Sequence, residues 1–155
     1  MKHGSDHRKT AYATTTYRCQ TEIATFSDTI FDASWGLPRT TTENHVVSEH
    51  DGVYLVPSKH VDQYVERYRA QCLRSTKASG KEFAFDFMNF KVSKCATFER
   101  VLIMPTAPFK AFIQKQTCLK STPAAAFYVV ATRAKHSLAI IMDKPGNSKL
   151  PVWVP

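Results

Sequence analysis

The residues of this chain best suited to chemistry are two arginines, Arg18 and Arg133, each of which stands beside an apolar segment. Arg133 lies between an alanine-rich run that begins at Thr122 and an apolar run that ends at Ile141. Guanidinium groups held in place can stabilise the negative charge that spreads over the oxygens during phosphoryl transfer. Taken alone, Arg133 would fit equally well as a cap of a helix C-terminus, where the helix dipole favours a cation. The motifs that accompany the two arginines decide between these interpretations.

Three motifs in the chain resemble those of superfamily 1, UvrD-like helicases. The first is Thr16-Tyr17-Arg18-Cys19, which resembles the family's Asn-Tyr-Arg-Ser element. The second, residues 88–103, is similar to the segment Ser-Lys-Gly-Leu-Thr/Glu-Phe-acidic-x-Val-Leu-Ile. The third surrounds Arg133 and resembles the pattern aromatic-Val-Ala-x-Thr-Arg-Ala-basic followed by a Leu-rich strand. The motifs occur in the family's order, so the resemblance implies the second, C-terminal RecA-like lobe of such a helicase.

The resemblance also implies roles for particular residues. Arg18 and Arg133 would be catalytic, facing the phosphates of a nucleoside triphosphate, only when a partner lobe completes the site. The implied nucleotide-binding residues are Tyr17, Arg18, Lys94, Thr97 and Arg133. The implied nucleic-acid-binding residues are Asn89, Lys91, Ser93 and Lys94. No metal ligand is implied.

The chain departs from the family pattern at several of these positions. Thr16 replaces Asn and Cys19 replaces Ser, which keeps size but changes hydrogen bonding. Cys95 stands where the second motif has its central glycine, and Ala96 replaces a larger apolar residue. The change at Cys95 matters if the backbone there adopts a conformation that only glycine reaches without strain.

Half of a nucleotide site is missing from the sequence. The chain contains no G-x-x-x-x-G-K-[ST] motif and no strand-terminal Asp-Glu pair to hold magnesium. We therefore expect no ATPase or helicase activity and no cofactor from this chain alone. ATP and Mg²⁺ would bind only if a partner lobe completed the site.

These features predict a truncated or stand-alone UvrD-like helicase C-terminal domain that binds single-stranded nucleic acid, with single-stranded DNA as the expected partner. A formal charge of +8 favours polyanionic partners through counterion release. One alternative is the trans-acting half of a split ATP-dependent DNA helicase, completed by a protein that supplies the N-terminal ATPase lobe. Another alternative is a non-enzymatic protein-interaction module.

Composition limits the other possibilities. With 155 residues and 43% hydrophobic residues, the chain fits one globular domain and is too short for two ATPase lobes. Four cysteines without C-x-x-C pairing favour reduced thiols over a zinc site or a disulfide framework. We see neither a membrane span nor a signal peptide, and we expect a cytoplasmic protein.

Hydrophobic periodicity predicts an α/β fold with a largely parallel sheet covered on both faces, and the resemblance implies that it is a three-layer RecA-like domain. Helices are expected at residues 17–31, 59–73, 109–116 and 124–135, and strands at 52–57, 83–90, 100–105 and 137–142. We expect a flexible lead-in over residues 1–13, the helicase-like domain over 14–143 and an extended tail over 144–155, anchored by Trp153. His45 and His50 fall in an irregular connector and are predicted to be exposed to solvent.

Overall fold

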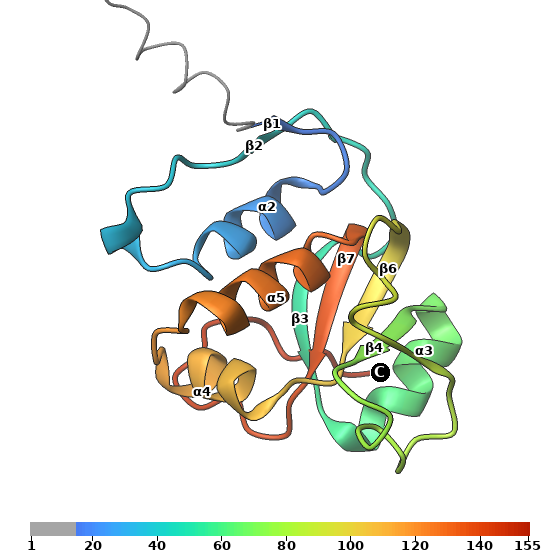
Figure 1. Ribbon diagram of the computed structural model, residues 1–155. Helices are drawn as coiled ribbons and strands as arrows, with labels where there is room; N and C mark the ends of the chain where they lie inside the picture. The colour runs from blue at the N-terminus through green and yellow to red at the C-terminus, as the bar shows by residue number, and fades with distance from the viewer. Residues whose placement is uncertain (1–14) are drawn as a thin grey trace, which may run out of the picture.

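A five-stranded parallel sheet forms the centre of the computed structural model, which describes residues 15–155 (Figure 1). The expected lead-in over residues 1–13 lies outside the described residues. All neighbouring strands of the sheet are parallel, and their order is β3-β7-β6-β4-β5. The strands are β3 (Gly52–Val56), β4 (Gln71–Arg74), β5 (Phe87–Asn89), β6 (Phe98–Ile103) and β7 (Ala134–Ile141).

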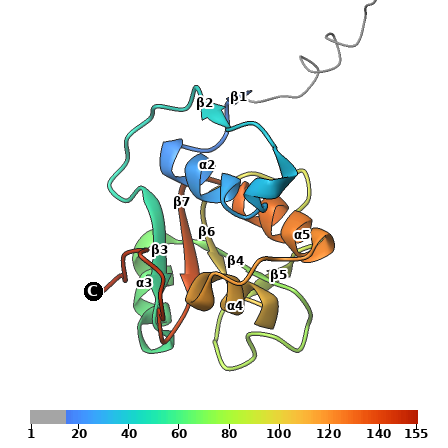
Figure 2. The same cartoon turned by 90° about the vertical axis from the view of Figure 1, so that its left-hand side faces the viewer.

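Helices cover both faces of this sheet. Figures 1 and 2 show α2 (Thr21–Asp28), α4 (Ala107–Lys115) and α5 (Ser121–Ala131) on one face and α3 (Val61–Tyr68) on the other. A short parallel pair, β1 (Thr15–Thr16) with β2 (Thr41–Thr42), lies beyond α2. Two single-turn 3₁₀ helices complete the elements, η1 (Ala33–Trp35) and η2 (Ser58–His60). The architecture is the predicted three-layer α/β fold.

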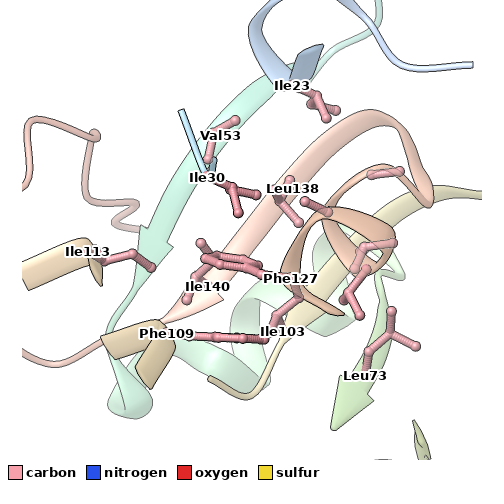
Figure 3. Close-up of a cluster of buried hydrophobic side chains, with 14 of the residues drawn as sticks. Ile23, Ile30, Val53, Leu73, Ile103, Phe109, Ile113, Phe127, Leu138 and Ile140 are labelled. Atoms are coloured by element: carbon pink, nitrogen blue, oxygen red, sulfur yellow. The ribbon is translucent and has the colours of Figure 1, made fainter. Parts of the chain in front are cut away.

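The central strands carry apolar side chains on both faces, and each face is covered by helices. In β7, Leu138 and Ile140 point into the cluster under α2, α4 and α5, where Phe109 and Phe127 stack with ring centroids 4.2 Å apart (Figure 3). Ala139 and Ile141 point to the opposite cluster under α3. Because successive side chains of a strand face opposite sides, a strand buried on both faces is a continuous apolar run, as the sequence shows.

Strand β4 was missed in the sequence, because residues 59–73 were predicted as one helix. Helix α3 ends at Tyr68, and Arg69 adopts a left-handed conformation (φ 54°) that turns the chain away. The next residues enter the sheet, with Cys72 buried on one face and Leu73 on the other. Position 72 also continues the helical spacing of the apolar residues of α3, so periodicity alone did not separate the helix from the strand.

The other predicted elements are present, with shifted ends. Helix α2 is shorter than predicted, since the Gln20 side chain caps it by accepting a hydrogen bond from the Ile23 amide (3.0 Å). Strand β5 is only three residues long, whereas residues 83–90 were predicted as a strand. Such shifts follow from caps and strand pairing, which hydrophobic periodicity does not encode.

The C-terminal tail is anchored by Trp153, as predicted. The Leu55 amide donates to the Pro151 carbonyl (2.9 Å), and the Trp153 amide donates to the Leu55 carbonyl (2.8 Å). The indole of Trp153 donates to the Tyr68 hydroxyl (3.3 Å) and packs edge-on against Tyr64. The tail thus adds an extended segment to the outer edge of β3.

The prediction that His50 is exposed was wrong, whereas His45 is exposed as predicted. The His50 ring is 6% exposed and is stacked between Tyr54 and Tyr68, with ring centroids 4.4 and 3.9 Å away. Its Nε2 shares a hydrogen bond with the Tyr64 hydroxyl (2.8 Å). Burial, followed by the nearby Arg100 charge, lowers the pKa of His50 to about 4.

We expect the protein to lose stability as the pH falls from about 6.5 to about 4. The unfolded chain binds a proton on His50 near its ordinary pKa of 6.5, whereas the folded chain does so only near 4, so acid favours unfolding. A shift of this size corresponds to a loss of about 2–3 kcal/mol of stability. Urea unfolding at a series of pH values measures the loss.

His50→Gln should flatten the pH dependence of the free energy of unfolding within this window. His45→Gln is the matched control, because His45 is exposed. An equal acid sensitivity in His50→Gln and the unmodified protein would contradict the assignment to His50.

Candidate phosphate and nucleic-acid interface

A polar hollow of about 500 Å³ lies where β6 and β7 begin. It is lined by Thr15, Thr16, Tyr17, Arg18, Thr97 and Lys135. Two backbone hydrogen bonds bring these segments together: the Gln20 amide donates to the Lys135 carbonyl (3.0 Å), and the Phe98 amide donates to the Arg133 carbonyl (2.8 Å). The lining contains two cationic side chains, hydroxyl groups and no carboxylate, which is a composition suited to an anion.

Tyr17 and Arg18 enter the hollow from the segment between β1 and α2. The Tyr17 side chain is 78% exposed, so its ring is available to stack on a ligand. Arg18 is half-buried, and its Nη1 donates to the Thr132 carbonyl (3.2 Å) at the end of α5. The Asn44 side-chain amide donates to the Arg18 carbonyl (2.6 Å), which fixes the backbone. These hydrogen bonds therefore fix Arg18 in place, and its guanidinium group lines the hollow.

Arg133 lies behind the hollow rather than on its wall. Its Nε donates to the Val129 carbonyl (2.9 Å) and its Nη1 to the Ala96 carbonyl (3.3 Å). Burial, and next the Arg18 charge, lower the pKa of Arg133. In this structure Arg133 thus acts as the helix cap that the sequence left open as an alternative, and it also ties the loop before β6 to α5.

Cys19 contributes a neutral thiol to the same junction. Its Sγ donates to the Thr132 carbonyl (3.4 Å), which also accepts the bond from Arg18. Burial raises the pKa of the Cys19 thiol to about 11 despite the neighbouring arginines. The thiol therefore acts as a weak hydrogen-bond donor and packing group.

The end of β5 and the loop between β5 and β6 carry the four residues predicted to contact nucleic acid: Asn89 ends the strand, and Lys91, Ser93 and Lys94 lie in the loop. Lys91 and Lys94 are exposed, and Asn89 is half-buried with its side-chain oxygen accepting from Arg74 Nε (3.0 Å). Ser93 is fully buried and donates to the Phe90 carbonyl (2.7 Å). This placement lets Ser93 hold the turn, with its hydroxyl away from the surface; its role as a nucleic-acid contact stays a prediction.

Only part of the predicted nucleotide-facing set meets at the hollow. Tyr17, Arg18 and Thr97 line it, whereas Lys94 and Arg133 do not. Lys135 lines it but was not predicted as a site residue. The sequence held a signal for Lys135, since the arginine motif ends on a basic position and this lysine occupies it.

The loop before β6 places Cys95 in a backbone conformation that favours glycine. Cys95 has φ 67°, in the left-handed region that costs a residue with a Cβ about 1–2 kcal/mol. Its side chain is exposed. Cys95 therefore carries local backbone strain between Lys94 and the segment held by Arg133.

Neither a metal centre nor a membrane segment is found in the part of the chain that the structure describes. Within residues 15–155, no three His, Cys, Asp or Glu side chains gather in a way that could hold an ion. No helix in this part of the chain is long and apolar enough to cross a bilayer.

Comparison with known proteins shows the fold. No protein-family model matches the chain, and no curated protein is significantly similar to it. Among solved structures, it is similar to the C-terminal domain of a possible DNA helicase from Lactobacillus plantarum WCFS1, with a TM-score of 0.51 and 12% identity over 86% of this chain and 91% of that one. A weaker likeness, with a TM-score of 0.44 and 20% identity, covers 82% of this chain and 23% of the PRRSV nsp10 helicase. The first likeness agrees with the parallel sheet flanked by helices, and the chain has a RecA-like α/β fold.

We expect Cys95→Gly to raise the free energy of unfolding by about 0.5–1 kcal/mol. Glycine relieves the left-handed strain but adds backbone entropy to the unfolded chain, so the net gain is smaller than the strain itself. Urea unfolding compares the variant with the unmodified protein.

Cys118→Gly is the matched control, because Cys118 is also exposed and its φ is not positive. That variant should lose roughly 0.5–1 kcal/mol of stability. A loss of stability in Cys95→Gly as large as in Cys118→Gly would show that the Cys95 backbone carries no strain.

Proposed function

We propose that this chain is a UvrD-like helicase C-terminal lobe that binds single-stranded nucleic acid in the cytoplasm and has no ATPase activity by itself. The observation that carries the proposal is the hollow at the start of β6 and β7, where Arg18 and Lys135 meet without a carboxylate. The fold shared with the C-terminal domain of a possible DNA helicase supports it. The three motifs, in the order of the UvrD-like family, support the finer assignment.

Exposed cations on the β5–β6 loop supply the surface for a nucleic-acid backbone. Lys91 and Lys94 both point to solvent, and Val92 between them is 66% exposed. The loop is held at both ends, since Ser93 closes its turn and Arg133 bonds the Ala96 carbonyl. A held cationic loop binds a phosphate backbone at a lower entropic cost than a mobile one.

Binding of single-stranded DNA should be sensitive to salt and weakened by removal of the loop charges. In a fluorescence-anisotropy titration of the full chain with labelled oligo(dT), we expect Lys91→Ala/Lys94→Ala to raise Kd about tenfold. The double variant should also reduce the slope of log K against log salt by about 1.4, since each phosphate contact on a single strand contributes about 0.7.

The matched control is Lys59→Ala/Lys144→Ala, which removes the same charge from exposed positions near the opposite edge of the sheet. Equal losses in the two double variants would assign the binding to net charge rather than to the loop. Absence of salt-sensitive binding in the unmodified chain would remove the nucleic-acid function and leave the protein-interaction module. Oligo(U) in parallel titrations measures the preference between DNA and RNA.

A second candidate function is the trans-acting half of a split ATP-dependent helicase. The position of Arg18 favours it, because Arg18 is held by Thr132 and still lines a hollow large enough for phosphate groups. The sequence holds no phosphate-binding loop, so the nucleotide's remaining contacts and Mg²⁺ would come from the partner lobe.

The hollow should bind a polyphosphate weakly even without a partner. By isothermal titration calorimetry with inorganic tripolyphosphate, Lys135→Ala is expected to weaken binding about fivefold to tenfold, whereas Lys59→Ala leaves it unchanged. Lys135 is the better probe, because Arg18→Ala would also remove a structural hydrogen bond to Thr132. Equal affinities in the two lysine variants would contradict a phosphate site in the hollow.

A further inference from the structure

Strands β4 and β5 lie side by side, and the two chain segments that leave their carboxyl ends pass to opposite faces of the sheet (Figure 2). The last residues of the two strands, Arg74 and Asn89, are partners in the parallel register. The segment 75–86, which follows β4, packs Phe83 against the cluster under α3. The loop that follows β5 packs Phe90 against the cluster on the other face. We name this place the divergence point; in open α/β sheets, ligands bind outside the carboxyl ends of strands where the connections diverge in this way.

Arg74 is held at the divergence point by two hydrogen bonds. Its Nε donates to the side-chain oxygen of Asn89 (3.0 Å), and its Nη1 donates to the carbonyl of Ser79 (3.4 Å). Within residues 15–155, Nη2 of Arg74 forms no hydrogen bond, and the side chain is half-buried rather than enclosed. Because the Asn89 oxygen faces Arg74, the side-chain NH₂ of Asn89 is a further donor at the same place. A fixed guanidinium with free donors suits a phosphate group.

Exposed lysines lie on both segments that leave the divergence point. Lys77 comes three residues after β4, Lys81 lies further along the same segment, and Lys91 comes two residues after β5. Two exposed carboxylates follow on the first segment, Glu82 beside Lys81, and Asp86, which directly precedes β5 and thus lies at the other end of that strand. Lys77 and Lys91 therefore add positive charge to that of the guanidinium group.

We propose that a single-stranded nucleic acid crosses the divergence point, with one backbone phosphate bound by Arg74 and Asn89 and neighbouring phosphates bound by Lys77 and Lys91. An extended polyanion fits this place, because the cations lie on two separate exposed segments on either side of one held arginine. This inference rests on the proposed nucleic-acid function and sets the course of the strand from the β5–β6 loop to the end of β4. The sequence motifs held no signal for it, since residues 74–81 belong to none of the three.

Lys77→Ala tests the course of the strand in a titration of the full chain with labelled oligo(dT), followed by fluorescence anisotropy over a series of salt concentrations. We expect Kd to rise about threefold and the slope of log K against log salt to fall by about 0.7, as for one lost phosphate contact on a single strand. Lys149→Ala is the matched control and should change neither value. It removes the same charge from an exposed position on the tail, beside the opposite edge strand β3.

Two substitutions of Arg74 separate a phosphate contact from structural support. Arg74→Gln removes the charge, so we expect Kd to rise about tenfold and the salt slope to fall by about 0.7. Arg74→Lys keeps the charge but loses the planar pair of donors, so Kd should rise only about threefold, with the slope unchanged. If Arg74 served only to hold segment 75–86, both variants would weaken binding to the same extent and neither would change the slope.

The possible outcomes separate this inference from the proposed function. Equal affinities of the Lys77→Ala and Lys149→Ala variants, or equal slopes of the Arg74→Gln and Arg74→Lys variants, would overturn the inference and leave the proposed function intact. Absence of salt-sensitive binding in the unmodified chain would overturn both. Circular dichroism checks that the variants fold; within residues 15–155 the Lys77 side chain forms no hydrogen bond, so Lys77→Ala decides the question even if an Arg74 variant does not fold.

Discussion

The candidate site depends on how the C-terminal end of α5 is satisfied. The last carbonyls of a helix have no partner within the helix, so donors from elsewhere must reach them. Here Arg18 and Cys19 bond the Thr132 carbonyl, and Arg133 bonds the Val129 carbonyl and, across the β5–β6 loop, the Ala96 carbonyl. This small set of bonds joins α2, α5 and the loop, and it places the hollow and the cationic loop at one end of the sheet.

The two arginines therefore have different surroundings: one bonds mainly backbone carbonyls, and the other also lines the hollow. Arg133 is largely committed to carbonyl groups, whereas Arg18 is anchored once and lines the hollow. Burial, and next the Arg18 charge, lower the pKa of Arg133, and no carboxylate lies in the lining of the hollow to balance the positive charge. A bound anion would relieve this repulsion, which is the physical reason why we propose phosphate binding at the junction.

The opposite edge of the sheet follows a different constraint. An open parallel edge exposes backbone donors and acceptors, and the tail covers β3 only as far as Pro151 allows. Trp153 secures the tail through Tyr64 and Tyr68, the same tyrosines that surround His50. Tail docking and the neutral state of His50 thus rest on one aromatic cluster.

Apolar runs in the sequence determined the α/β class and the buried strands β3, β6 and β7, because a strand covered on both faces is hydrophobic throughout. Of the five residues that the motifs implied for nucleotide binding, Tyr17, Arg18 and Thr97 line one hollow, whereas Lys94 and Arg133 do not. Only the tertiary structure decided that Gln71–Arg74 is a strand, that His50 and Ser93 are buried, and that Arg133 bonds carbonyls while Lys135 enters the site. The physical reason is that periodicity reports how one segment is buried, whereas strand pairing, capping and polar burial depend on which distant segments meet it.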